Sequence, residues 1–301
     1  MPRVAVVTDS TADLPIALCH RYGITVVPMS IEHDGQFLDD KPELALTIAR
    51  SSTSERLRVY HPPPSRFVET YRQLGKAHEA IVSIHLSQRL SGTLHSALEA
   101  SRAVSGQVAV RVLDSGSVSM GLGFVALRAA QAALAGASLG EVVASAQLAA
   151  ESVSVFFLLG STGPLRQRRR IGWAAGLLTD VLGIRPLLTM SEGVVVPVTR
   201  AWARPHGISQ LYELATEFPR IERLAVIRSP ELRETELDAL LWSICPPTRR
   251  LETTFSAALM SWFGPEAVGM AIDASMGGSE EETDGDVDAL ATSLDRNRQH
   301  G

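Results

Sequence analysis

The chain has 301 residues, 45% apolar, 20% charged and 5% aromatic, which excludes a disordered chain, a collagen-like repeat and a small disulfide scaffold. Its net charge of −5 lies entirely in residues 279–301, so residues 1–278 are neutral and lack the basic surface that nucleic-acid binding needs. Two distant cysteines, and no apolar stretch long enough to span a bilayer, favour a cytoplasmic protein without stable membrane insertion.

The first half of the chain alternates short β-branched runs with longer amphipathic stretches. Runs rich in Val and Ile, typical of buried strands, are 3–8, 24–28, 80–85 and 108–113. Stretches with helical spacing are 13–22, 65–78, 92–104, 118–135 and 138–150. Because apolar strands alternate with helices, we predict a parallel sheet covered by helices on both faces.

A second block begins near residue 152 and again mixes strands with helices. Strand patterns occupy 154–159, 193–198 and 224–227, and the block ends with an apolar run around 267–272. Helical patterns occupy 164–170, 173–182, 205–217 and 230–244. We therefore expect an α/β protein with two mixed α/β domains, an N-terminal one over 1–152 and a C-terminal one over 153–278. Residues 279–301, with seven acids against two arginines, are typical of a disordered tail, and a short helix at 286–294 is the alternative.

Hydroxyl-rich segments directly follow three of the predicted strands. They are 9–13 (DSTAD), 86–93 (LSQRLSGT) and 114–117 (DSGS). Parallel strands end at one edge of a sheet, where ligands bind, so we expect a polar mouth that accepts an anion, lined in part by Ser10 and Ser115. Ser, Thr and Asp also cap helices and form turns, and for any single segment that role is the more common one.

The sharpest candidate within these segments is the sequence Ser91-Gly92-Thr93. We predict Ser91 as the N-cap of the following helix, where the amides of Gly92 and Thr93 and the helix dipole favour a carboxylate or phosphate oxygen. Glycine lets a ligand approach the backbone closely. His61, just before three prolines, is a further candidate donor to an anion, although a turn histidine without such a role is more common.

Enzyme signatures are missing from the sequence. Lys41 and Lys76 are the only lysines, and neither lies in the Gly-rich context of a P-loop. No G-x-G-x-x-G follows a strand, and G-x-S-x-G and H-E-x-x-H are absent, as is a metal-ligand cluster. We therefore expect no enzymatic activity, no cofactor and no metal. A small-molecule enzyme using His61 or His85 as acid–base is the third-ranked alternative.

Arginines form the other notable cluster. They are Arg166, Arg168, Arg169 and Arg170, followed later by Arg185, Arg200 and Arg204. The cluster is either a solvated helix face or a docking surface for an acidic or phosphate-bearing partner, and the sequence favours neither.

Five blocks together resemble the DegV family. They are 4–15 (VAVVTDSTADLP), 24–30 (ITVVPMS), 83–97 (SIHLSQRLSGTLHSA), 112–123 (VLDSGSVSMGLG) and 182–189 (LGIRPLLT). The resemblance implies a two-domain protein of fatty acid metabolism that binds one long-chain fatty acid in an apolar tunnel between its domains. The carboxylate would meet hydroxyl groups at the mouth, and a separate fatty-acid kinase subunit would receive it.

Some of the family's motif residues are present in this sequence and others are replaced. Ser91 is the serine of the family's S-G-T motif, and Arg166 and Arg170 are the outer arginines of its kinase-contact segment, with Arg204 as a further docking candidate. However, Val59 replaces the carboxylate-binding threonine, and Trp262 replaces the histidine of the family's H-T-G-P-G motif. Two readings follow: a fatty-acid-binding protein with an altered head-group site, or a docking and regulatory protein whose pocket no longer binds fatty acid.

Overall fold

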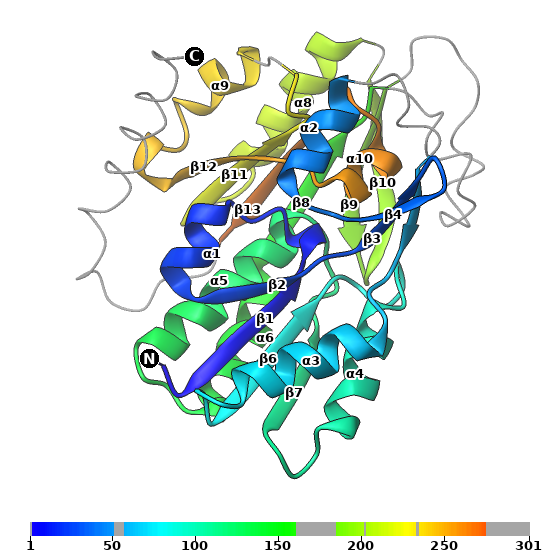
Figure 1. Ribbon diagram of the computed structural model, residues 1–301. Coiled ribbons are helices and arrows are strands. Elements are labelled where there is room, and N and C mark those ends of the chain that lie inside the picture. The colour runs from blue at the N-terminus through cyan, green and yellow to red at the C-terminus, as the bar shows by residue number, and fades with distance from the viewer. Residues whose placement is uncertain (1, 51–56, 161–184, 202, 233–234, 275–301) are drawn as a thin grey trace, which may run out of the picture.

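The computed structural model describes residues 2–50, 57–160, 185–201, 203–232 and 235–274. Two large sheets and a small third one organise these residues, as Figure 1 shows. Several sequence predictions fall outside this part of the chain: the helices at 164–170 and 173–182, the arginines at 166–170, and the tail at 279–301.

The first sheet is parallel throughout. Its strands, in spatial order, are β2 (Ile24–Val27), β1 (Val4–Asp9), β6 (Ala80–His85) and β7 (Ala109–Asp114). This confirms the predicted parallel sheet. From β1 the chain proceeds to β2 on one side, while β6 and β7 lie on the other side. The carboxyl ends of β1 and β6 therefore flank a switch point, where open α/β sheets bind their ligands.

Helices cover both faces of this sheet, as predicted. On one face lie α3 (Pro64–Leu74) and α4 (Thr93–Ala103), and on the other lie α5 (Met120–Leu134) and α6 (Leu139–Ser152), with α1 (Ile16–Tyr22) beside β2. Side chains of β1 alternate accordingly: Val4 and Val6 belong to the core cluster that contains α5, whereas Ala5 and Val7 belong to the cluster that contains α3.

The second sheet is mixed and mostly antiparallel. Its spatial order is β10 (Val194–Ala201), β9 (Arg185–Ser191), β8 (Val153–Leu158), β13 (Val268–Asp273), β11 (Arg223–Arg228) and β12 (Arg250–Thr254). Only β11 and β12 pair in parallel among its described strands. Its outer side carries α8 (Arg204–Thr216) and α9 (Glu236–Leu241), and η4 (Pro247–Arg249) leads into β12. The predicted helix over 230–244 is thus wrong in extent, because its described helical part is α9 alone.

Helix α5 lies between the two large sheets. It contacts β1 and β6 of the first sheet and β8 and β13 of the second. Its side chains share one apolar cluster with Val6 of β1 and Phe157 of β8. The mixed α/β class is confirmed. The division at 152/153 remains a proposal, which the separation of the two sheets along the sequence supports, since all strands of the second begin at Val153 or later.

The third sheet and two helices were missed by the sequence analysis. The strands are β4 (Gln36–Asp39), β3 (Ser30–His33) and β5 (Arg58–Tyr60), and the helices are α2 (Pro42–Arg50) and α10 (Ala257–Phe263). α10 packs against α2, β5 and the short η1 (Ser10–Ala12), so it reaches the carboxyl edge of the parallel sheet. Among the helices described, none combines the length and apolarity needed to cross a membrane.

Candidate functional site

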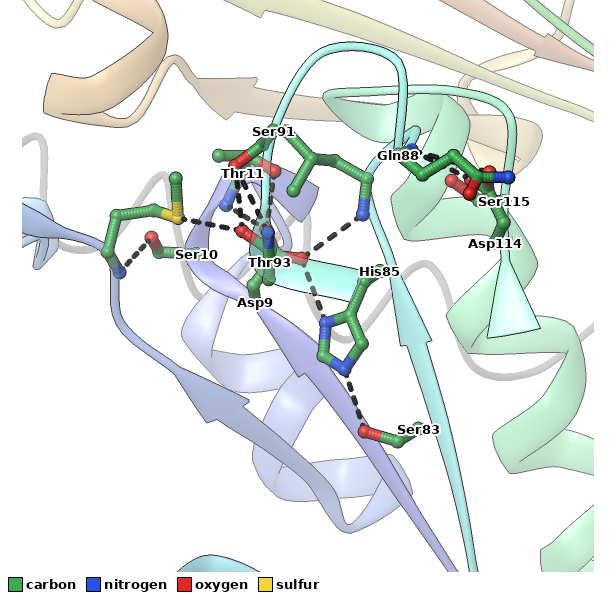
Figure 2. Close-up of polar contacts among 12 residues, drawn as sticks. Asp9, Ser10, Thr11, Ser83, His85, Gln88, Ser91, Thr93, Asp114 and Ser115 are labelled. Atoms are coloured by element: carbon green, nitrogen blue, oxygen red, sulfur yellow. Dashed lines mark hydrogen bonds and ion pairs between the residues drawn. The ribbon is translucent and has the colours of Figure 1, made fainter. Parts of the chain in front are cut away.

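The three hydroxyl-rich segments meet at the carboxyl edge of the parallel sheet, as predicted. The backbone amide of Leu86 donates to Asp9 Oδ2 at 3.1 Å, which joins the segments after β6 and β1. The amide of Ser87 donates to the Ser117 carbonyl at 2.9 Å, which joins the segments after β6 and β7. Figure 2 shows the resulting group of polar side chains.

Below this edge runs a buried chain of hydrogen bonds. Tyr71 donates to Ser83 Oγ at 2.8 Å, Ser83 Oγ lies 2.7 Å from His85 Nε2, and His85 Nδ1 lies 3.0 Å from Asp9 Oδ2. Burial raises the pKa of Tyr71, so the phenol remains the donor. Both ring nitrogens of His85 therefore lie within hydrogen-bond distance of groups inside the core, Ser83 on one side and Asp9 on the other.

Although this chain of hydrogen bonds joins a Ser, a His and an Asp in the order of a catalytic triad, its burial argues for a structural role. The side chains of Ser83, His85 and Asp9 are all 0% exposed. A catalytic base must reach its substrate, and both nitrogens of His85 already have partners inside the core. This burial favours a structural role for His85 over the acid–base role considered for it.

Gly92, rather than Ser91, is the N-cap of α4, which corrects the prediction. Ser91 lies one residue earlier, and its Oγ accepts from the amide of Thr93 at 3.3 Å instead of from an amide further into the first turn. Ser91 Oγ also lies 3.0 Å from Thr93 Oγ1. The two hydroxyls thus form a pair at the start of the helix.

This pair has a hydrogen available for a ligand. Two hydroxyls carry two hydrogens, and one of them joins the two oxygens. The remaining partner seen among the described residues is Met29 Sδ, 3.7 Å from Thr93 Oγ1, and a thioether is a weak acceptor. An anionic oxygen would compete for that hydrogen successfully.

The hydroxyls of the other two predicted serines, Ser10 and Ser115, form hydrogen bonds with other groups of the protein. Ser10 donates to Asp40 Oδ2 at 2.8 Å and accepts from the Met29 amide at 3.0 Å. Ser115 donates to the Ser117 carbonyl at 3.3 Å and accepts from the Ser117 amide at 3.1 Å. Ser10 reaches the Ser91 turn through Met29, whereas Ser115 lies with Asp114 and Gln88 beyond it (Figure 2).

His61 lies against the Ser91 turn. A Cβ atom on Gly92 would stand 3.0 Å from Cε1 of His61 and 3.1 and 3.2 Å from its Nδ1 and Nε2. Because these three distances are nearly equal, the face of the ring lies over Gly92, and only glycine leaves room for it there. The structure thus brings together Ser91, Gly92, Thr93 and His61, of which His61 is exposed.

Two buried carboxylates that the sequence analysis missed connect this edge to α10. Asp40 accepts from Ser10 and, through Oδ1, from the amides of Ala257 at 2.9 Å and Ala258 at 3.4 Å. Asp13 accepts from Ser119 Oγ at 2.6 Å and the Ser256 amide at 2.8 Å. Burial raises the pKa of Asp40 to about 6, and it raises the pKa of Asp13 as well.

Comparison with known proteins identifies the family to which the chain belongs. The family model described as "Uncharacterised protein, DegV family" matches residues 3–275. The chain belongs to the DegV family. A DegV domain-containing protein of Streptomyces coelicolor is 37% identical over 217 residues, which cover 71% of this chain and 76% of that protein.

Solved DegV structures have the same fold. A DegV family protein from Thermus thermophilus, described with respect to its fatty acid binding, is 29% identical with a TM-score of 0.80, covering 90% of this chain and 99% of that one. DegV of Bacillus subtilis, described as a fatty acid binding protein, is 26% identical with a TM-score of 0.79 and the same coverage. Structures of this family are thus described as fatty acid binding.

Both departures from the DegV pattern join the apolar core. Val59 of β5 and Trp262 of α10 are partly buried and pack against the central cluster, and β5 and α10 contact each other. Apolar side chains therefore stand at both positions where the DegV resemblance places hydrogen-bond donors.

Two arginines bind Glu266, which lies four residues after Trp262. Arg185 Nη1 lies 3.1 Å from Glu266 Oε2 and donates to the Gly160 carbonyl at 2.9 Å, while Arg204 Nη1 donates to the Glu266 carbonyl at 3.0 Å. Arg204, a predicted docking residue, thus has an internal contact, whereas Arg166 and Arg170 lie outside the described residues. Within the described part of the chain, no group of three His, Cys, Asp or Glu side chains is placed to hold a metal ion.

Proposed function

We propose that this DegV protein binds one long-chain fatty acid, with the carboxylate at the Ser91 turn and the acyl chain in an apolar tunnel between its two domains. The observation that carries the proposal is the Ser91–Thr93 hydroxyl pair, which has an available hydrogen beside the β1/β6 switch point. The DegV relatives described as fatty acid binding support the ligand class.

In this proposal the residues have unequal roles. The Ser91–Thr93 pair donates its one available hydroxyl hydrogen, Gly92 lets the carboxylate approach the backbone, and Ser10 and Ser115 shape the surrounding turns. Burial of the acyl chain supplies most of the affinity, at about 0.8 kcal/mol per methylene. The head-group contacts then fix the orientation of the ligand rather than its total binding energy.

We further propose that the protein is a carrier and not an enzyme, and that it presents the carboxylate to a separate fatty-acid kinase. The sequence contains no P-loop lysine, so the phosphoryl donor would be bound by that partner. Arg166, Arg170 and Arg204 are the residues we propose for docking. Reversing the charge of Arg166 and Arg170 together should weaken association with such a kinase.

The first test is native mass spectrometry of the purified protein, followed by solvent extraction of any bound molecule. A stoichiometric fatty acid supports the carrier function. Val59 and Trp262 favour the second reading, a docking and regulatory protein with a filled pocket. A protein that is empty and also refuses added oleate supports that reading and contradicts fatty-acid binding.

A Ser91→Ala variant tests the site itself. Removal of the hydroxyl should weaken oleate binding about tenfold, the loss of one charge-assisted hydrogen bond. Ser101→Ala is the matched control, because Ser101 lies on the same helix and donates to the Leu98 carbonyl at 2.8 Å. Equal oleate affinity of Ser91→Ala and the wild type would refute the assigned role of Ser91.

A further inference from the structure

We propose that His61 is the proton-dependent contact of the ligand carboxylate, so that fatty-acid binding is linked to proton uptake. The inference rests on the proposed function and assigns a regulation to the same site. Its basis is the position of an exposed imidazole directly on the anion-binding turn.

The geometry places the imidazole within reach of a carboxylate at this turn. All three atoms of its Nδ1–Cε1–Nε2 edge lie 3.0–3.2 Å from the Cβ position of Gly92. The ring therefore lies face-on against the turn, between Ser91 and Thr93 in sequence, and a small rotation of this exposed side chain would bring a ring nitrogen to a carboxylate bound there. The following residues Pro62, Pro63 and Pro64 restrict the backbone, and Pro64 begins α3, so this segment is held in place.

The chemistry of the site explains why a histidine is useful there. Val59 and Trp262 offer no donor to an oxygen anion except the indole N–H, and both pack against the apolar core. An imidazolium compensates with a charge-assisted bond, whereas a neutral imidazole gives a weaker one. Because imidazole changes charge between about pH 5 and 8, the strength of binding would follow the pH.

The neighbouring charged groups are already engaged with one another. Beside His61, Tyr60 donates to Glu32 at 2.7 Å, and Arg58 lies 3.8 Å from the same carboxylate. On α3, Arg66 pairs with Asp39 of β4. On α4 the titratable groups are His95, Glu99 and Arg102, all exposed, of which His95 lies in the first turn. Among the described residues, none forms a hydrogen bond or ion pair with His61, which leaves its ring nitrogens for a ligand.

The carboxylates behind the turn are Asp9, Asp13 and Asp40. Asp9 is held by His85 and the Leu86 amide, and Asp13 by Ser119 and the Ser256 amide. Asp40, with a pKa raised to about 6 by burial, would also repel a bound carboxylate more strongly as the pH rises. It therefore acts in the same direction as His61, and the experiment must separate the two.

The test measures oleate binding by isothermal titration calorimetry between pH 6 and 8, in buffers of different ionisation enthalpy. We expect the wild type to bind oleate about fivefold to tenfold more tightly at the lower pH and to take up protons on binding. His61→Gln should lose most of this dependence, Asp40→Asn should keep most of it, and His95→Gln should keep all of it. Oleyl alcohol, which has the chain without the carboxylate, should bind without a pH effect.

A second variant probes the position of the ring without removing it. Gly92→Ala places a methyl group against the imidazole and pushes this exposed side chain away, and the φ of −76° at Gly92 is acceptable for alanine. We expect Gly92→Ala to flatten the pH profile as His61→Gln does. An unchanged profile in His61→Gln, or a flat one in Asp40→Asn, overturns the inference while leaving fatty-acid binding intact. Absence of oleate binding in the wild type overturns the proposed function and this inference together.

Discussion

Two groups of serine and histidine lie close together at the carboxyl edge of the parallel sheet and differ in how their hydrogen bonds are used. In the buried chain, Ser83 and His85 have partners on both sides and end at Asp9. In the Ser91 turn, one hydroxyl hydrogen has the weak acceptor Met29 Sδ as its partner among the described residues, and the ring of His61 is exposed. Residue type alone does not separate the two groups. Donors that are all satisfied inside the core hold the fold, and donors that are not satisfied can bind a ligand.

The largest expected effect comes from breaking the buried group at Asp9. Its carboxylate accepts from the amide and hydroxyl of Thr11, the amide of Leu86 and the imidazole of His85. Asn at this position keeps one acceptor oxygen and turns an NH₂ group toward these donors. We expect Asp9→Asn to lower the free energy of unfolding by about 3–5 kcal/mol, measured by urea denaturation.

Asp114 offers the matched control for Asp9. It ends the neighbouring strand β7 in the same way, but it is only partly buried and accepts from the amides of Gly116 at 2.9 Å and Gln88 at 3.3 Å. Asp114→Asn should lower the free energy of unfolding by about 1 kcal/mol or less. Similar losses for the two variants would contradict the distinction between a buried structural group and the more open edge.

Asp40, which joins Ser10 to the first amides of α10, makes the free energy of unfolding depend on pH. Burial raises its folded-state pKa to about 6, above the unfolded value near 4, so the folded state favours the neutral acid. The contribution of Asp40 to the free energy of unfolding is therefore fully present below about pH 4. Roughly 2–3 kcal/mol of it is lost as the pH rises through about 6. Asp13 contributes with the same sign, because burial raises its pKa too.

Asp40→Asn isolates this contribution. Asn can still accept from the Ala257 and Ala258 amides, and its NH₂ group can donate to Ser10 Oγ. Between about pH 4 and 7 the wild type should lose more unfolding free energy than Asp40→Asn, a difference obtained from denaturation midpoints across pH. Parallel pH curves for the two proteins would mean that Asp40 ionises as freely when folded as when unfolded.

The sequence predicted the parallel sheet and its polar edge because these depend on local patterns. The apolar strand 80–85 and the SGT motif after it are readable without any distant residue. By contrast, the roles of Asp13 and Asp40 depend on the amides of Ser256 and Ala257, more than 200 positions away, and α10 is too short for a clear periodicity. The strand over 58–60 is equally short, so β5 gave no usable pattern.

His85 and His61 show the same contrast between local patterns, which the sequence reveals, and distant contacts, which it does not. His85 was a candidate acid–base group because a strand end near a polar segment is a common place for one. Its partner Ser83 is two residues away, but Asp9 comes from β1 and Tyr71 from α3, so its full satisfaction appears only when the sheet is assembled. The contact of His61 with Gly92 likewise joins β5 to α4 across a sequence gap that no pattern spans.

The smallest expected effect adds a donor to the open group instead of removing one from the buried group. Val59→Thr keeps the shape of the side chain and restores the hydroxyl that the DegV resemblance places there. If position 59 borders the head group, oleate should bind about threefold to tenfold more tightly, while oleyl alcohol should bind as before. Because Val59 is partly buried, the hydroxyl should also lower the free energy of unfolding by about 1 kcal/mol.

The matched control is Val112→Thr, at a partly buried position of β7 that packs against the same core cluster as α3. This variant should cause a similar loss of stability with no gain in oleate affinity. Equal oleate affinities for Val59→Thr and the wild type would place the carboxylate away from β5, because a hydroxyl beside an anion with few donors cannot be neutral.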